Sequence, residues 1–186
     1  MTRLISIHDA ILARLERADW LLPTLARFLF AAILAGYYWA AGLTKLGDGV
    51  SGLFRPSPGA YTQIFPRAME AAGHDIGELS FLHWAVVTAG TWAEFALPAL
   101  IVLGLLTRLA ALGMIGLVVL QSLTDLYGHG AIAEPATVGA WFDTAPGGVI
   151  LDQRALWVFV LLVLVVRGAG PVSLDRLMSA GARPLS

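Results

Sequence analysis

The segment FLHWAVVTAGTWAEFALPALIVLGLLTRLAALGMIGLVVLQSLTDLY spans residues 81–127 and consists of two long apolar runs. Only Thr107 and Arg108 separate the runs. Each run is about the length that a helix needs to cross the hydrocarbon core of a bilayer, roughly 20 residues. The sequence therefore predicts a transmembrane helical hairpin with spans at residues 81–106 and 108–127.

The composition supports membrane insertion of the whole chain. Of 186 residues, 58% are hydrophobic and 13% are charged, and the mean hydropathy is +0.75, well outside the balance of a soluble domain. A net charge of −1 offers no basic field for nucleic acid, which we exclude as a partner. The absence of Cys excludes disulfides, thiolate catalysis and Cys-ligated metal centres. Because no fixed-period repeat is present, we expect one domain over residues 1–186.

The remaining segments complete an all-α membrane four-helix bundle. Residues 4–20 have apolar side chains near one helical face, which predicts an amphipathic helix lying in the membrane interface. Further spans are expected at residues 22–46 and 153–167, with Gly- and Pro-rich loops before and after the hairpin. The sequence predicts that nothing is cleaved from the N-terminus, because the first long apolar run has no cleavage pattern.

Four spans put both termini on one side of the membrane, and basic residues identify that side. Positive residues collect on the cytoplasmic side of inner-membrane proteins. The side with the termini carries Arg3, Arg14, Arg17, Arg27, Arg108, Arg167, Arg176 and Arg183, and the opposite side carries Lys45, Arg55, Arg67 and Arg154. We therefore expect both termini to be cytoplasmic.

Three segments carry a resemblance to a known family. They are GLTKL at residues 42–46, AEFALPALIVLGLLTRLAALGMIGLVV at residues 93–119 and GPVSLDRLM at residues 170–178. With four spans in this order they resemble the DoxX family of small bacterial membrane proteins. The resemblance implies a four-helix inner-membrane protein associated with redox or oxidative-stress functions. Relatives in the broader group include a subunit of a thiosulfate:quinone oxidoreductase. One established reaction is not implied, so we expect a non-catalytic or partner-dependent subunit of an oxidoreductase system.

Glu94 is the main candidate site residue because it lies near the middle of its span. A charged side chain at the centre of a membrane helix costs about 2.5 to 3.5 kcal/mol on insertion scales for Asp, Lys or Arg, and it marks a functional site or a buried pair. One interpretation is a structural ion pair with Arg27. A second is a carboxyl group that accepts protons or faces a quinone. The third is a protonated Glu94 hydrogen-bonded to Tyr38 or to a backbone carbonyl.

Further polar residues lie toward the outer ends of the spans and could line an outward-facing cavity. The candidates are Tyr38, Lys45, His83, Gln121 and Asp125, together with Tyr37 and His129. His83 shares a helical face with Glu94, and Gln121 and Asp125 are four residues apart. The alternative is that these are ordinary interface residues, which collect at span ends. His83 and His129 have no metal- or haem-binding spacing, so we expect no metal site.

Two function hypotheses remain. In the first, the chain is a redox-linked subunit that binds a quinone or a lipid-like molecule near Glu94. In the second, it is a non-catalytic scaffold that docks a partner oxidoreductase through residues 47–80 and 128–151. In both hypotheses the chain contacts membrane lipids and a protein partner in a redox complex.

Overall fold

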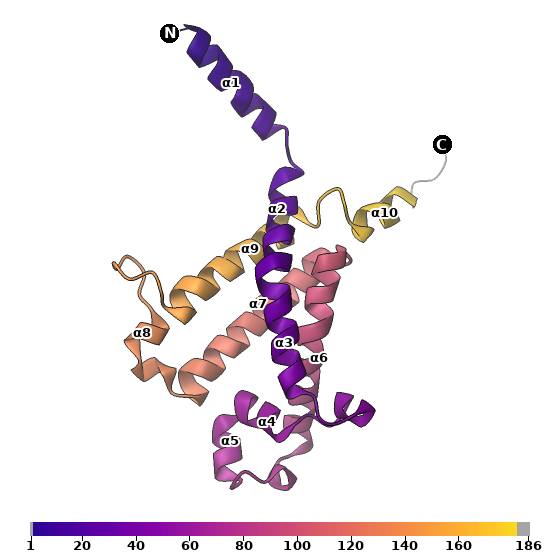
Figure 1. Cartoon of the computed structure of the whole chain (residues 1–186), viewed down its shortest axis with the longest axis vertical. Coiled ribbons are helices and arrows are strands. Elements are labelled where there is room, and N and C mark those ends of the chain that lie inside the picture. Colours follow the sequence, from indigo (N-terminus) through magenta and orange to yellow (C-terminus); the bar gives the residue numbers. More distant parts are fainter. Residues whose placement is uncertain (1, 182–186) are drawn as a thin grey trace.

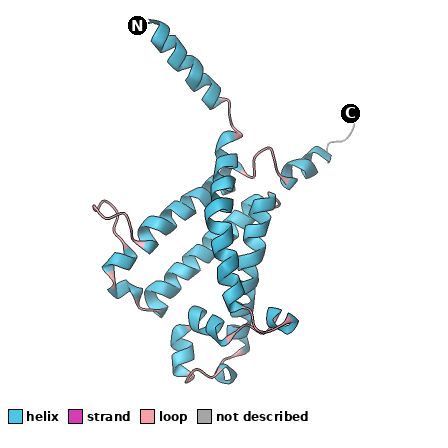
Figure 2. Cartoon of the chain, in the orientation of Figure 1, coloured by secondary structure: helices cyan, strands magenta, loops and turns pink. Residues whose placement is uncertain are grey.

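The computed structural model describes residues 2–181, and every regular element in that range is a helix (Figures 1 and 2). Four helices within these described residues are long and apolar enough to cross a membrane. They are Leu21–Lys45, Phe81–Leu103, Thr107–Gly128 and Val149–Arg167. The prediction of an all-α membrane bundle with four spans is confirmed.

The first span is continuous but changes helical geometry near its middle. It consists of α2 (Leu21–Leu29), a π-helical segment η1 (Phe30–Ala35) and α3 (Gly36–Lys45). Pro23 lies in the first turn of α2, where its missing N–H has no intrahelical partner to lose. The buried side chains of Phe30, Leu34 and Tyr38 form the face that packs into the bundle.

The hairpin forms as the sequence predicts, with a sharp turn. α6 (Phe81–Leu103) and α7 (Thr107–Leu123) pack against one another, and the π-helical η4 (Thr124–Gly128) extends α7. α6 ends three residues before the expected boundary because Gly104 adopts a left-handed conformation with φ of 68°. Pro98 lies inside α6 and is buried.

The last span is longer than the 153–167 expected. A π-helical turn, η6 (Val149–Gln153), precedes α9 (Arg154–Arg167). The Asp152 carboxylate accepts a hydrogen bond of 2.7 Å from the backbone N–H of Gly148. This local bond satisfies a donor at the start of the helix and allows it to begin earlier.

Shorter helices flank the spans. α1 (Thr2–Glu16) ends before the expected boundary at residue 20 and extends away from the bundle in Figure 1. α10 (Leu174–Gly181) lies near the same end, so both described ends of the chain are at one end of the bundle. The connecting segments contain η2 (Val50–Leu53), α4 (Pro58–Ile64), α5 (Pro66–Ala71), η3 (Ile76–Glu78), η5 (Ala131–Ala133) and α8 (Pro135–Val138).

The helices bury a narrow core and expose a wide apolar surface. The main core includes Ile101, Met114 and Leu161 between the spans. Phe28 and Phe159 are more than 60% exposed. On four helices long enough to span a bilayer, an apolar surface of this extent is suited to contact with lipid. The chain is therefore a multi-pass membrane protein in contact with lipid.

A second cluster lies at the end of the bundle opposite the termini. Tyr61 and Met69 from α4 and α5 are buried against Val87 of α6. The two short helices thereby cover the first turns of α6, beyond the end of α3 (Figure 1). This cover forms one wall of the candidate site.

Candidate functional site

The centre of the site is a buried ion pair between the first span and α6. Lys45 Nζ lies 2.9 Å from Glu94 Oε2, and the two side chains are 7% and 12% exposed. Lys45 Nζ also donates to the Ala41 carbonyl oxygen at 3.2 Å. The lysine therefore directs its long stem back by one turn, from the end of α3 toward the bundle interior.

The interpretation that paired Glu94 with Arg27 is wrong. Arg27 instead donates to the carbonyl oxygens of Ala169, at 2.8 Å, and Val172, beyond the end of α9. Its Nη1 also lies beside Gly104. Glu94 precedes Gly104 by ten residues, about 15 Å along the helix, which is too far for a guanidinium at this level. Carbonyl groups in a connecting segment have no helical partner, and a guanidinium group can donate several hydrogen bonds to them.

A cavity of about 210 Å³ lies beside the Lys45–Glu94 pair. Apolar side chains of α6 and α7 form much of its wall, with the α4 residue Ile64 opposite. It is lined by Lys45, Gln63, Ile64, Val86, Gly90, Glu94, Leu117, Leu120, Gln121, Thr124, Asp125 and His129. The structure thus brings Lys45, Glu94, Gln121 and Asp125 to one cavity, together with His129.

Gln121 is held in place by the two adjacent tyrosines of α3. Its Nε2 donates to Tyr37 Oη at 2.8 Å, and its Oε1 accepts a longer hydrogen bond of 3.5 Å from Tyr38 Oη. Tyr38 is 1% exposed and packs near Trp157, so it lies behind the cavity wall. Tyr38 makes no hydrogen bond to Glu94. Its hydroxyl group instead helps to orient the Gln121 side chain, which lines the cavity.

Asp125 pairs with Arg154, which the sequence placed among the basic residues on the side opposite the termini. Arg154 Nη2 lies 2.5 Å from Asp125 Oδ2, and Arg154 Nη1 donates to Ser122 Oγ at 3.1 Å. The arginine is 5% exposed. The sequence contained a signal for this pair, because Asp125 and Arg154 have opposite charges and lie at the same end of two expected spans. This second pair joins α7 and η4 to α9 and leaves the charges around the cavity balanced.

His83 does not face the cavity, contrary to the sequence-based expectation. Its Nδ1 accepts a hydrogen bond of 3.2 Å from the Ser80 backbone N–H and lies 2.8 Å from Ser80 Oγ. Its ring packs edge-on against the Phe65 ring, with 4.8 Å between the two ring centroids. His83 therefore takes the part of the acidic residue in a capping box at the start of α6.

His129 contacts the mouth of the cavity from the loop after η4. Its Nε2 lies 3.1 Å from the carbonyl oxygen of Gln63, which belongs to α4. Gly128 lies against Pro66, where an added Cβ would come within 2.9 Å of the proline ring. These contacts bring the two loop regions together over the site.

The site combines balanced charges with directed polar groups. Lys45 and Glu94 form one pair, and Asp125 and Arg154 form the other. The ammonium and the Gln121 amide can donate hydrogen bonds, and the carboxylates can accept them. A ligand that fits this cavity is uncharged and carries oxygen atoms on an otherwise apolar body, because an added charge would be unpaired at low dielectric.

The comparison with known families identifies a matching family model. The DoxX family model matches residues 23–124, which is more than half of the chain. The match covers most of the first three spans and includes Lys45, Glu94 and Gln121. No curated protein and no solved structure matches the chain. The chain belongs to the DoxX family.

Proposed function

We propose that the chain is a membrane subunit of a redox-linked complex, and that the cavity beside Lys45 and Glu94 binds the head of a quinone. The observation that supports this most directly is a buried ion pair at the wall of a partly apolar cavity. A quinone ring is uncharged and presents two carbonyl oxygens. Lys45 Nζ and Gln121 Nε2 can each donate a hydrogen bond to such an oxygen.

Glu94 would exchange protons with the bound quinone. Oxidation of a quinol to a quinone releases two protons and two electrons. The Glu94 carboxylate, which Lys45 stabilises in its ionised form, can accept the proton of one quinol hydroxyl group, and the second proton would leave to water at the mouth of the cavity. The electrons would pass to a redox centre of a partner subunit. Glu94 is then the proton-transfer residue, Lys45 and Gln121 are binding residues, and Asp125 is a positioning residue.

We further propose that the protein lies in the bacterial inner membrane with both termini in the cytoplasm. The basic residues at the end with the termini support this orientation. The cavity would then open toward the periplasmic half of the membrane.

The cavity itself can be tested without changing its charges. Gly90 lines it, and an added Cβ there has only Ile64 within 4 Å, at 3.8 Å. Gly90→Val should fill part of the cavity and weaken quinone binding roughly tenfold or more, equal to about 1.4 kcal/mol. Gly116→Val is the matched control, because Gly116 faces open space on α7. Calorimetric titration of the purified chain with a short-chain ubiquinone measures both affinities.

The outcomes separate the proposal from its alternative. Saturable binding that Gly90→Val loses and Gly116→Val keeps supports the quinone site. Absence of saturable binding to the unchanged chain rejects it.

The scaffold hypothesis has its own supporting observation. Val50 and Phe142 lie in the two segments outside the spans and are 85% and 105% exposed. Phe142 also has a positive φ of 67°, which is unusual for a bulky residue. If the chain docks a partner through these segments, Phe142→Asp should release an oxidoreductase that co-purifies with the unchanged chain. Co-purification in equal amounts with the variant would count against this docking surface.

A further inference from the structure

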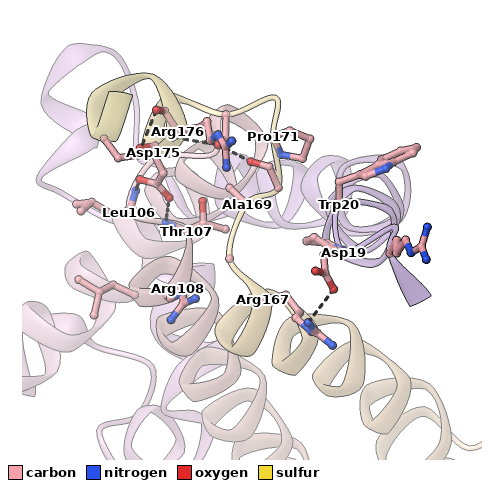
Figure 3. A pocket seen from close by; sticks show the side chains of 17 residues that line it. Asp19, Trp20, Leu106, Thr107, Arg108, Arg167, Ala169, Pro171, Asp175 and Arg176 are labelled. Carbon is pink, nitrogen blue, oxygen red and sulfur yellow. Dashed lines mark hydrogen bonds and ion pairs between the residues drawn. The ribbon is translucent and has the colours of Figure 1, made fainter. Parts of the chain in front are cut away.

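A second and larger cavity lies at the opposite end of the bundle, away from the proposed quinone site. It has a volume of about 870 Å³ and lies where both described ends of the chain are found (Figures 1 and 3). Its walls come from the connection between α1 and α2, the turn between α6 and α7, and the segment between α9 and α10. The charged residues that line it are Arg17, Asp19, Arg108, Arg167, Asp175 and Arg176.

The two carboxylates of the cavity are already engaged. Asp175 accepts hydrogen bonds from the backbone N–H groups of Leu106, at 2.7 Å, and Thr107, at 3.0 Å (Figure 3). Asp19 lies 3.6 Å from Arg167 Nη1 and forms an exposed ion pair with it. The acidic groups therefore do not neutralise the remaining arginines.

Three guanidinium groups remain available for a ligand. Within residues 2–181, no carboxylate lies within ion-pair distance of Arg17, Arg108 or Arg176. Arg108 lies over Gly168, where an added Cβ would come within 3.4 Å of the arginine Nε. A cavity that gathers three unpaired guanidinium groups favours an anion with several oxygen atoms, such as a phosphate group.

The rim of the same cavity is apolar. Trp20 is 54% exposed, Leu106 is 54% exposed and Leu109 is 67% exposed. All three lie at or near the ends of the spans, the level at which lipid headgroups meet acyl chains. A free phosphate would use the arginines but would gain nothing from these side chains.

We propose that this cavity binds an acidic phospholipid, with Arg108, Arg176 and Arg17 around the phosphate and the acyl chains along Trp20, Leu106 and Leu109. Basic cavities between membrane helices on the cytoplasmic side are suited to anionic headgroups. The bound lipid bridges the α6–α7 turn, the end of α9 and α10, so it also joins the C-terminal helix to the bundle.

The test is native mass spectrometry of the purified full chain in detergent. Phosphatidylglycerol and phosphatidylcholine with identical acyl chains are titrated separately. Phosphatidylglycerol should bind about tenfold or more tightly than phosphatidylcholine, because the zwitterionic choline headgroup adds a cation beside the arginines. Equal affinities would overturn the proposal, and this comparison uses the unchanged chain.

Variants locate the site. Arg108→Gln should weaken phosphatidylglycerol binding about fivefold, and Arg108→Gln with Arg176→Gln about 25-fold, from about 1 kcal/mol for each basic residue near an anionic lipid. Arg67→Gln is the control, because Arg67 is exposed at the other end of the bundle. Unchanged binding by the double variant would overturn the assignment.

A further competition distinguishes a lipid from a free anion. Soluble glycerol phosphate carries the same phosphate chemistry without acyl chains. It should fail to displace phosphatidylglycerol at equal concentration. Displacement at equal concentration would identify a site for free phosphate compounds and would overturn the lipid proposal.

Discussion

Lys45 is the residue on which the geometry of the proposed site depends. It is the last residue of α3, yet its side chain is only 7% exposed, because the ammonium group lies back toward the Ala41 carbonyl oxygen and the Glu94 carboxylate. A lysine at a helix end usually extends to water. Here the carboxylate compensates for the lost hydration, and each member of the pair makes burial of the other possible.

A double-mutant cycle measures this dependence. Lys45→Met or Glu94→Gln alone should lower the free energy of unfolding by about 3 to 5 kcal/mol, because either change leaves an unmatched group in a buried site. The double variant should lose less than the sum of the two. Unfolding of the purified chain in mixed micelles with increasing dodecyl sulfate provides the measurement, with Arg55→Met as an exposed control. Additive losses would show that the two residues do not interact.

Asp175 makes a second residue-scale prediction, which concerns pH. Burial acts to raise the pKa of Asp175, but hydrogen bonds from Thr107 and Leu106 outweigh it and hold the pKa below its ordinary value of 3.8. A carboxyl group with a lowered pKa in the folded state stabilises that state above its ordinary pKa, and loses this effect as the pH falls through the lowered value.

Asp175 accepts hydrogen bonds from backbone N–H groups at the start of α7 and so acts as a helix cap. Asp175→Asn should therefore lower the free energy of unfolding by about 1 kcal/mol at pH 7, the typical contribution of a helix cap. The difference from the unchanged chain should shrink as the pH falls below about 3.8. Thermal unfolding midpoints between pH 7 and pH 3 give the comparison. Asp48→Asn serves as the control, because Asp48 is exposed and its side chain makes no hydrogen bond within the described residues. A difference that is independent of pH would contradict the capping role.

At the scale of elements, the contact between α3 and α6 depends on the absence of a side chain at Gly42. An added Cβ would lie 2.7 Å from two ring atoms of Phe95, well inside van der Waals contact. Trp39 Nε1 donates to the Phe95 carbonyl oxygen at 3.2 Å and joins the same two helices. Small residues allow such close approach of membrane helices. This approach brings Lys45 within reach of Glu94.

Gly42→Ala should push the two helices apart or displace the Phe95 ring, with a loss of about 1 to 3 kcal/mol from overpacking. Gly36→Ala in the same span is the matched control. Gly36 is exposed and has no atom within 4 Å of an added Cβ, so the change should be close to neutral. Thermal unfolding midpoints of both variants measure this difference, and the midpoint of Gly42→Ala should be the lower of the two. Equal midpoints for the two alanine variants would argue against a packing role of Gly42.

At the scale of the whole molecule, the four spans place residues 129–148 and the described C-terminal helix at opposite ends of the bundle (Figure 1). The chain has no Cys, so a single introduced thiol reports its own location. Asp143→Cys in intact spheroplasts should react with a membrane-impermeant maleimide. Ser179→Cys should react only after the membrane is opened. The reverse pattern would overturn the orientation inferred from the basic residues.

The elements of this protein follow from local sequence. Apolar runs of about 20 residues form membrane helices wherever they occur, because a backbone in lipid must satisfy its hydrogen bonds internally. The hairpin over residues 81–127 and the spans expected near residues 22–46 and 153–167 follow this rule. Lys45, Glu94, Gln121 and Asp125 were also identifiable as polar residues that a membrane segment would not carry at random.

The pairing of these residues was decided by tertiary structure. Glu94 meets Lys45 and not Arg27, Asp125 meets Arg154, and His83 caps its own helix. Sequence periodicity gives the face on which a side chain lies, but it does not give the axial offset between two helices. That offset depends on close contacts such as Gly42 against Phe95, and on how far a side chain reaches from its own helix. Helix positions therefore came from sequence, whereas the partners of the buried charges came from packing.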